Sequence, residues 1–128
     1  MHAFLKAAVD QVLPGASRQY RWWRDGRRES QARPIETGMG FSLCGDEGIA
    51  RLHLVQDDID QMLAIIAEGD AFVDVGAYIG LFACMAASIG KPVLAVEPHP
   101  VALRFLYKNL RANGFAGEVF PVALGSEP

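Results

Sequence analysis

The chain has 128 residues, of which 51% are hydrophobic and 21% charged, with a formal net charge of −3. This length is that of one domain and suffices to bury a core. The composition is too apolar for a disordered protein, and the negative charge argues against nucleic-acid binding through bulk charge. The two cysteines, Cys44 and Cys84, fit neither a disulfide scaffold nor a zinc-site spacing. We therefore expect no metal and a reducing, cytoplasmic compartment.

Residues 1–39 are the first part of the predicted organisation. Apolar residues recur at helical spacing over residues 3–13, and Pro14 and Gly15 end this predicted helix. The segment 18–33 holds six arginines and two tryptophans against two acidic residues. Two interpretations of this segment are open, a solvated basic face that packs on the acidic segment 36–74 and a patch that contacts an anionic partner.

Residues 40–128 are the second part, and they begin with a predicted hairpin. Residues 41–44 and 49–55 have the pattern of two strands around a turn at 45–48. A helix follows, with Asp57 and Asp58 as its N-terminal caps and Gly69 as its stop. Its apolar stripe consists of Ile59, Met62, Leu63 and Ile66.

From Ala71 onward, short apolar strands alternate with helices. The predicted strands are residues 71–75, 93–97 and 119–124, and the helices between them end near Gly90 and at Asn113-Gly114. Fully apolar strands separated by helices indicate parallel pairing through right-handed crossovers. We therefore predict an α/β fold with a Rossmann-like, doubly wound parallel sheet, preceded by a helix and a β-hairpin. A buried strand and helix explain the apolar run 71–90 better than a membrane span does.

A turn with two glycines, residues 74–80, follows the first of these strands. Glycines permit positive φ angles and let a ligand approach the backbone, while the next helix presents unpaired N–H groups. Glu97 ends the next strand, where an acidic side chain of this topology accepts hydrogen bonds from ribose hydroxyls. The pattern predicts a nucleotide site containing Asp74, Gly76, Gly80 and Glu97. A second interpretation of Asp74 is that it caps the following helix.

The glycine spacing distinguishes between two nucleotide cofactors. A dinucleotide site has Gly-x-Gly-x-x-Gly, whereas this chain has Gly76-x-x-x-Gly80 with Tyr78 in place of a middle glycine. The carboxylate of Asp74 would repel a pyrophosphate and attract the ammonium group of a methionine moiety. These charges favour S-adenosylmethionine over NAD.

Four blocks of sequence carry a resemblance to a known family. They are Phe72-Val73-Asp74-Val75-Gly76-Ala77-Tyr78-Ile79-Gly80, Val96-Glu97-Pro98-His99-Pro100, Leu106 through Asn109 to Asn113-Gly114, and Ala123-Leu124-Gly125. These blocks resemble the FkbM family of S-adenosylmethionine-dependent methyltransferases, most of which methylate hydroxyls of sugars, lipids or other metabolites. The resemblance runs from about Gly40 to the end of the chain and covers none of residues 1–39.

The resemblance implies S-adenosylmethionine as the cofactor and assigns parts of it to parts of the chain. The turn surrounds the methionine end, Glu97 takes the ribose, and Ala123 and Leu124 lie beside the adenine. No nucleophile–base pair is visible, so we assign no catalytic residue. The cofactor-binding residues implied are Asp74, Gly76, Ala77, Tyr78, Gly80, Glu97, Pro98, Ala123 and Leu124.

The chain departs from the family pattern at two places. Tyr78 stands where the family usually has Asn, which tolerates a left-handed backbone better. The predicted sheet also stops after its third strand, so we interpret residues 40–128 as the N-terminal half of a class I methyltransferase domain. Its first strand would then be an exposed edge, which predicts self-association.

The predicted function is S-adenosylmethionine-dependent methyl transfer to a small-molecule hydroxyl acceptor, with no nucleic acid and no membrane span. The alternative is a non-catalytic nucleotide-binding or interaction fragment that uses its basic N-terminal segment. A third possibility, part of an NAD-dependent oxidoreductase, is disfavoured by the glycine spacing. Calorimetry with S-adenosylhomocysteine and with NAD separates the three.

Overall fold

The computed structural model describes residues 24, 26–27, 31–45 and 56–126. Contacts divide the chain into two compact units, Met1–Gln31 and Ala32–Pro128, and the second unit is the subject of the description below. The predicted helix over 3–13, most of the segment 18–33 and the predicted strand over 49–55 lie outside the described residues.

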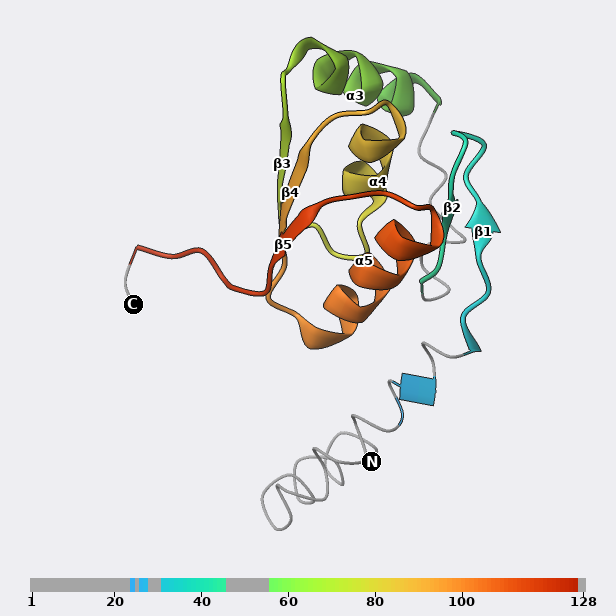
Figure 1. Ribbon diagram of the computed structural model, residues 1–128, viewed down its shortest axis with the longest axis vertical. Coiled ribbons are helices and arrows are strands. Elements are labelled where there is room, and N and C mark those ends of the chain that lie inside the picture. Colours follow the sequence, from blue (N-terminus) through green and yellow to red (C-terminus); the bar gives the residue numbers. More distant parts are fainter. Residues whose placement is uncertain (1–23, 25, 28–30, 46–55, 127–128) are drawn as a thin grey trace, which may run out of the picture. The chain divides into compact units, whose positions relative to one another are not determined.

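The main sheet has three parallel strands in the order β3-β4-β5 (Figure 1). They are β3 (Phe72–Val75), β4 (Val93–Val96) and β5 (Glu118–Phe120). This sheet confirms the predicted parallel pairing. β5 is shorter than predicted, since its ladder with β4 ends at Phe120, immediately before Pro121. Residues 121–125 have no regular structure and run away from the sheet (Figure 1).

Three helices, α3 (Gln56–Glu68), α4 (Leu81–Ser88) and α5 (Pro100–Ala112), lie on one face of this sheet (Figure 1). α4 packs against β3 and β4, and it also contacts α3 and α5. The predicted apolar stripe of α3 faces the core, while Asp57 and Asp58 lie within its first turn and not at a cap position. The apolar run 71–90 forms a strand and a helix, β3 and α4, as predicted, but only the helix is largely buried, since β3 buries Asp74 alone. No helix of the described residues has the length and hydropathy of a membrane span.

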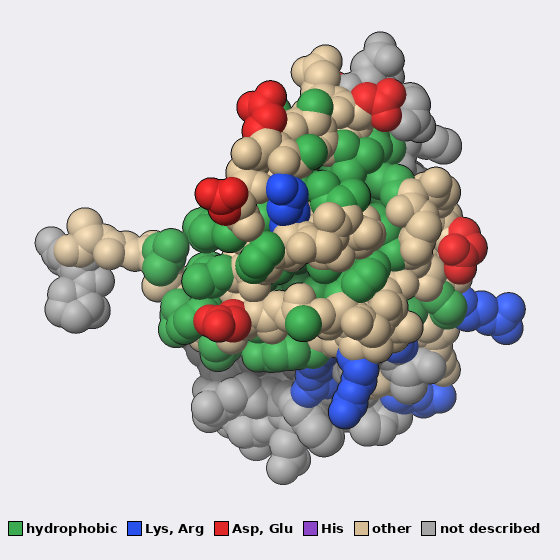
Figure 2. Space-filling view, turned by 45° about the horizontal axis from the view of Figure 1, so that its top comes forward, with side chains coloured by type: hydrophobic (Ala, Val, Ile, Leu, Met, Phe, Trp, Pro, Cys, Tyr) green, Lys and Arg blue, Asp and Glu red, His purple; other side chains and the backbone are tan. Residues whose placement is uncertain are grey.

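The opposite face of the sheet is not covered by any described helix. Side chains alternate along β3, so that Asp74 is buried while Val73 and Val75 are 59% and 61% exposed. Phe120 on β5 is exposed too, and β3 pairs with no described strand other than β4. Figure 2 shows hydrophobic side chains gathered at the surface where the C-terminal segment leaves the sheet. The predicted edge strand is therefore present, with apolar side chains on its open face.

A small antiparallel hairpin packs on the helices from the side away from the sheet (Figure 1). It pairs β1 (Ile35–Glu36) with β2 (Ser42–Leu43), so the predicted strand over 41–44 is confirmed but is paired with the segment before it. A tight turn at 37–41 allows this pairing, because Gly38 and Gly40 adopt positive φ and the Thr37 hydroxyl donates to the carbonyl of Phe41 at 2.6 Å.

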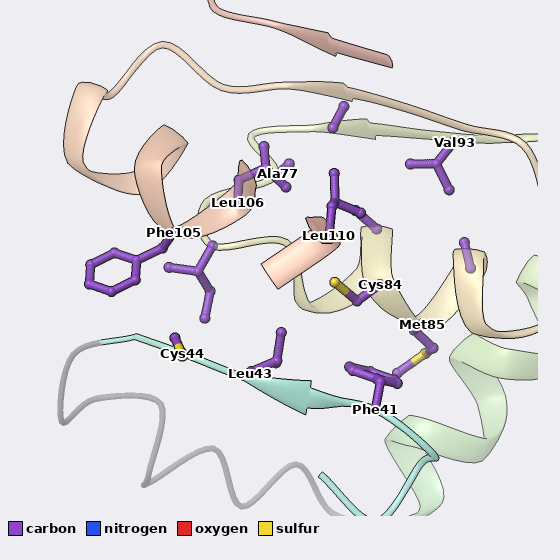
Figure 3. Packing of buried hydrophobic residues seen from close by; sticks show 14 of the residues in the cluster. Phe41, Leu43, Cys44, Ala77, Cys84, Met85, Val93, Phe105, Leu106 and Leu110 are labelled. Carbon is purple, nitrogen blue, oxygen red and sulfur yellow. The ribbon is translucent and has the colours of Figure 1, made fainter. Parts of the chain in front are cut away.

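The hydrophobic core fills the space between the sheet, the helices and the hairpin. In Figure 3, side chains of the hairpin lie opposite side chains of α4 and α5, with β3 and β4 beyond them. The residues labelled in that view are Phe41, Leu43, Cys44, Ala77, Cys84, Met85, Val93, Phe105, Leu106 and Leu110, all of them buried. The turn that begins the candidate site is thus anchored in the core through Ala77.

Candidate functional site

The turn between β3 and α4 crosses the carboxyl end of β4. The backbone N–H groups of Gly76 and Ala77 both donate to the carbonyl of Val96, at 2.8 and 3.1 Å. Gly76, Tyr78 and Gly80 all have positive φ angles, of 79°, 53° and 89°. These three left-handed residues fold the turn back over the end of β4, next to Glu97, which follows β4 directly.

Glu97 is buried and joins three segments of the chain. Its Oε2 accepts the backbone N–H of Tyr78 at 2.8 Å, and its Oε1 accepts the N–H of His99 at 2.7 Å. Its own N–H donates to the carbonyl of Phe120 at 3.1 Å. A carboxylate has about four lone-pair sites, so two remain for further donors. The sequence predicted this acid at the end of its strand but not the backbone groups that fix it.

Asp74 is buried on the helix-covered face of β3. Its Oδ2 has no hydrogen-bond partner among the described residues. Burial raises the pKa of the Asp74 carboxyl, a hydrogen bond from the backbone of Ala83 lowers it, and the charge of Glu97 raises it further. The bond to Ala83 agrees with the helix-capping interpretation, and the Oδ2 atom is a buried acceptor that no described donor satisfies.

Cys84 lies on α4, close enough to Asp74 for the charge of this carboxylate to act on the Cys84 thiol. Burial, with a contribution from Asp74, raises the pKa of the Cys84 thiol to about 12. The side chain is fully buried in the core, as its place on an apolar helix predicts. A thiol that stays protonated at neutral pH is a packing group and not a nucleophile.

The two glycines of the turn differ in their surroundings. A Cβ built at Gly76 would meet no atom within 4 Å, so the space above this backbone is open. A Cβ at Gly80 would lie 2.5 Å from Cδ1 of Leu106, so a side chain here would force Leu106 to move and would also strain a backbone with a φ of 89°. Gly76 therefore offers its backbone to an approaching group, while Gly80 lets α5 pack against the turn.

The remaining residues of the predicted site are spread more widely. Ala77 is buried, and Tyr78 and Pro98 are exposed beside Glu97. Ala123 and Leu124 are exposed in the segment that leaves the sheet (Figure 1). The structure thus brings Asp74, Glu97 and the turn together, and it leaves Ala123 and Leu124 outside this cluster.

Sequence reasoning missed two side chains that hold the region in place. Asn109 is 1% exposed and bonds to Cys44 and Ile79, and Asn113 bonds to Ser42. One signal for them was available. Both asparagines fall at helical spacing from the apolar residues Phe105 and Leu106, which places Asn109 on the buried face of α5 and Asn113 on the same side at its C-cap.

Comparison with known proteins adds no assignment, since no model of a known family and no curated protein matches the chain. The candidate site therefore stands on its own chemistry. It offers two buried carboxylates and an accessible glycine backbone, and the described residues contain no group of three metal-ligating side chains. Such a site suits a ligand that donates hydrogen bonds and carries positive charge.

Proposed function

We propose that this chain binds S-adenosylmethionine at the carboxyl ends of β3 and β4. In this proposal it provides the cofactor site of a Rossmann-like methyltransferase that transfers a methyl group to a hydroxyl of a sugar, lipid or other small metabolite. One observation carries the proposal. Two buried carboxylates, Asp74 and Glu97, flank an open glycine turn at the same edge of a parallel sheet, where ligands of α/β folds bind.

Glu97 fits the ribose. Its two oxygens are held by the N–H groups of Tyr78 and His99, so the carboxylate is already oriented before any ligand arrives. Each oxygen retains a lone pair for a hydroxyl donor. A vicinal diol presents two such donors at neighbouring positions, and the charge on the carboxylate strengthens both hydrogen bonds.

Asp74 and Gly76 fit the methionine end of the cofactor. The unpartnered Oδ2 of Asp74 is a buried acceptor, and an ammonium group would supply the missing donor and an opposite charge. The open space at Gly76 admits a ligand against the backbone. A pyrophosphate in this place would meet two carboxylates, which is why we prefer S-adenosylmethionine to NAD.

The chain's contribution to methyl transfer would be binding and orientation. When bound, S-adenosylmethionine supplies an electrophilic methyl group on its sulfonium. Asp74 and Glu97 would hold the two ends of the cofactor, so that positioning provides part of the rate acceleration. We assign no general base, because the described part of the site contains no nucleophile–base pair. The resemblance to the FkbM family adds support for this reading.

Titration calorimetry tests the proposal with the whole 128-residue chain. We expect S-adenosylhomocysteine to bind saturably with a stoichiometry of one, and NAD to bind far more weakly. An adenosine control measures how much of the affinity comes from the amino-acid end. Absence of S-adenosylhomocysteine binding by the folded chain, or tighter binding of NAD, would overturn the proposed function.

A further inference from the structure

Asn109 on α5 and Asn113 at the C-cap of α5 lie one turn apart. Each holds one residue of the hairpin segment by both of its backbone groups. Asn113 accepts the N–H of Ser42 at 3.0 Å and donates to its carbonyl at 2.7 Å. Asn109 accepts the N–H of Cys44 at 2.6 Å and donates to its carbonyl at 2.9 Å. The two amides thus pair with this segment as a neighbouring strand would, along the side that β1 does not occupy.

The two asparagines differ in where their second N–H points. Asn113 donates it to the carbonyl of Asn109 within its own helix, at 2.7 Å. Asn109 donates it to the carbonyl of Ile79, at 2.8 Å, and so reaches the turn of the candidate site. Asn109 is therefore bonded to both the hairpin and the turn.

The turn needs an external partner at this point. Gly80 is the N-cap residue of α4 and has a left-handed backbone; as a glycine it has no side chain to cap the helix. Its conformation sets the direction of the carbonyl of Ile79, a residue that is itself buried. A buried carbonyl requires a donor, and Asn109 supplies it. The preceding residue, Tyr78, presents the N–H that Glu97 accepts.

We propose that Asn109 is a positioning residue for the cofactor-binding turn, with the β1–β2 hairpin as its support. The identity of the ligand in this inference rests on the proposed function. The hydrogen bonds by which Asn109 holds the turn do not depend on that function. Asn109 holds the turn at the carbonyl of Ile79, and Glu97 holds it at the N–H of Tyr78. Asn109 thereby holds the Gly76–Gly80 backbone in the form that the ligand meets.

A matched pair of variants tests this role. Asn109→Ala and Asn113→Ala each release one hairpin residue, but only Asn109→Ala releases the carbonyl of Ile79. We expect amide hydrogen exchange at Tyr78 and Gly80, relative to α3, to rise in Asn109→Ala and to stay unchanged in Asn113→Ala. We also expect the Kd for S-adenosylhomocysteine to rise about tenfold in Asn109→Ala alone. Equal exchange at the turn in the two variants would overturn the inference.

A measurement on the unaltered chain covers the case in which Asn109→Ala does not fold. The side-chain amide signals of Asn109 should shift in nitrogen–proton spectra when S-adenosylhomocysteine is added, while those of Asn113 stay in place. Equal or absent shifts in the presence of saturating ligand would count against the inference. If S-adenosylhomocysteine does not bind but the exchange difference is found, the proposed function fails and the positioning of the turn by Asn109 stands.

Discussion

The backbone N–H of Tyr78 and the Oε2 atom of Glu97 lie 2.8 Å apart in a hydrogen bond that joins the turn after β3 to the end of β4. The carboxylate that we assign to the ribose therefore also shapes the turn that we assign to the methionine end. Tyr78 has a positive φ of 53°, so this bond helps to hold a backbone conformation that tyrosine rarely adopts.

Replacement of Tyr78 by asparagine tests the cost of that conformation. Asparagine tolerates the left-handed region, so Tyr78→Asn should stabilise the chain by up to about 1 kcal/mol. Binding of S-adenosylhomocysteine should stay level or tighten, because the N–H donated to Glu97 is retained. Denaturant unfolding and calorimetry measure the two effects. Marked weakening of binding would show that the tyrosine side chain itself contacts the ligand.

Gly76 has a matched control in Gly90. Both residues have a φ of 79°, and an added Cβ would meet no atom within 4 Å at either position. Gly76→Ala and Gly90→Ala should therefore cost a similar amount of stability, about 1 kcal/mol each, through backbone strain. Only Gly76→Ala should weaken S-adenosylhomocysteine binding, because only there would the new methyl group occupy the space of the ligand. Equal affinity in the two variants would remove Gly76 from the site.

The raised pKa of Asp74 predicts how stability changes with pH. The folded chain binds this proton more tightly than the unfolded chain does, so keeping Asp74 ionised at neutral pH costs stability. That cost shrinks as the pH falls through the raised pKa and is gone below the usual value of 3.8. Asp74→Asn should thus melt higher than the unaltered chain at pH 7.5, with a difference that narrows toward about pH 4.

The same substitution should weaken binding of S-adenosylhomocysteine at neutral pH, since an amide offers the ammonium group no charge. Thermal melting across pH and calorimetry at pH 7.5 are the two measurements. A variant that is less stable than the unaltered chain at pH 7.5 would show that the carboxylate of Asp74 stabilises the fold, contrary to its burial without a partner for Oδ2.

The open face of β3 predicts self-association of the chain in solution. Val73 and Val75 place apolar side chains on this face, next to an edge that no described strand covers. Val73→Lys should shift sedimentation profiles toward monomer. Ile65→Lys on α3 is the control, because Ile65 is 64% exposed, close to the 59% of Val73. A monomeric unaltered chain at high concentration, or an equal effect of both lysines, would contradict the prediction.

Much of the fold could be predicted from apolar patterns, because α4, β4 and α5 bury most of the residues that their patterns mark as apolar. β3 was found from its apolar residues as well, but its burial is the reverse of its pattern, since Asp74 is buried while Val73 and Val75 are exposed. The pairing of β1 with β2 could not be predicted, because two-residue strands are too short to show a period, and the pairing depends on the tight turn with Gly38 and Gly40. The length of β5 was overestimated, since apolar residues continue past Pro121 although the ladder does not.

Part of the candidate site could also be predicted from the pattern of apolar and polar residues. Asp74 and Glu97 could be found from their places on apolar strands, where an acid is conspicuous. For Asn109 the helical spacing indicates burial but not a role, because its role depends on contacts with Cys44 and Ile79, which lie 65 and 30 positions away in the sequence. A polar residue on a helix gives no sign of such distant partners.

The most direct test of the account is the preference of the chain for S-adenosylhomocysteine over its 2′-deoxy analogue, measured by calorimetry for the unaltered chain and for Glu97→Gln. Any loosening of the turn affects both ligands, so their affinity ratio isolates the contact with the hydroxyl. A charge-assisted hydrogen bond predicts a ratio of at least about tenfold for the unaltered chain and a clearly smaller ratio for Glu97→Gln, whose neutral amide oxygen makes a weaker bond. The same ratio in both proteins would contradict the assignment of the ribose to Glu97.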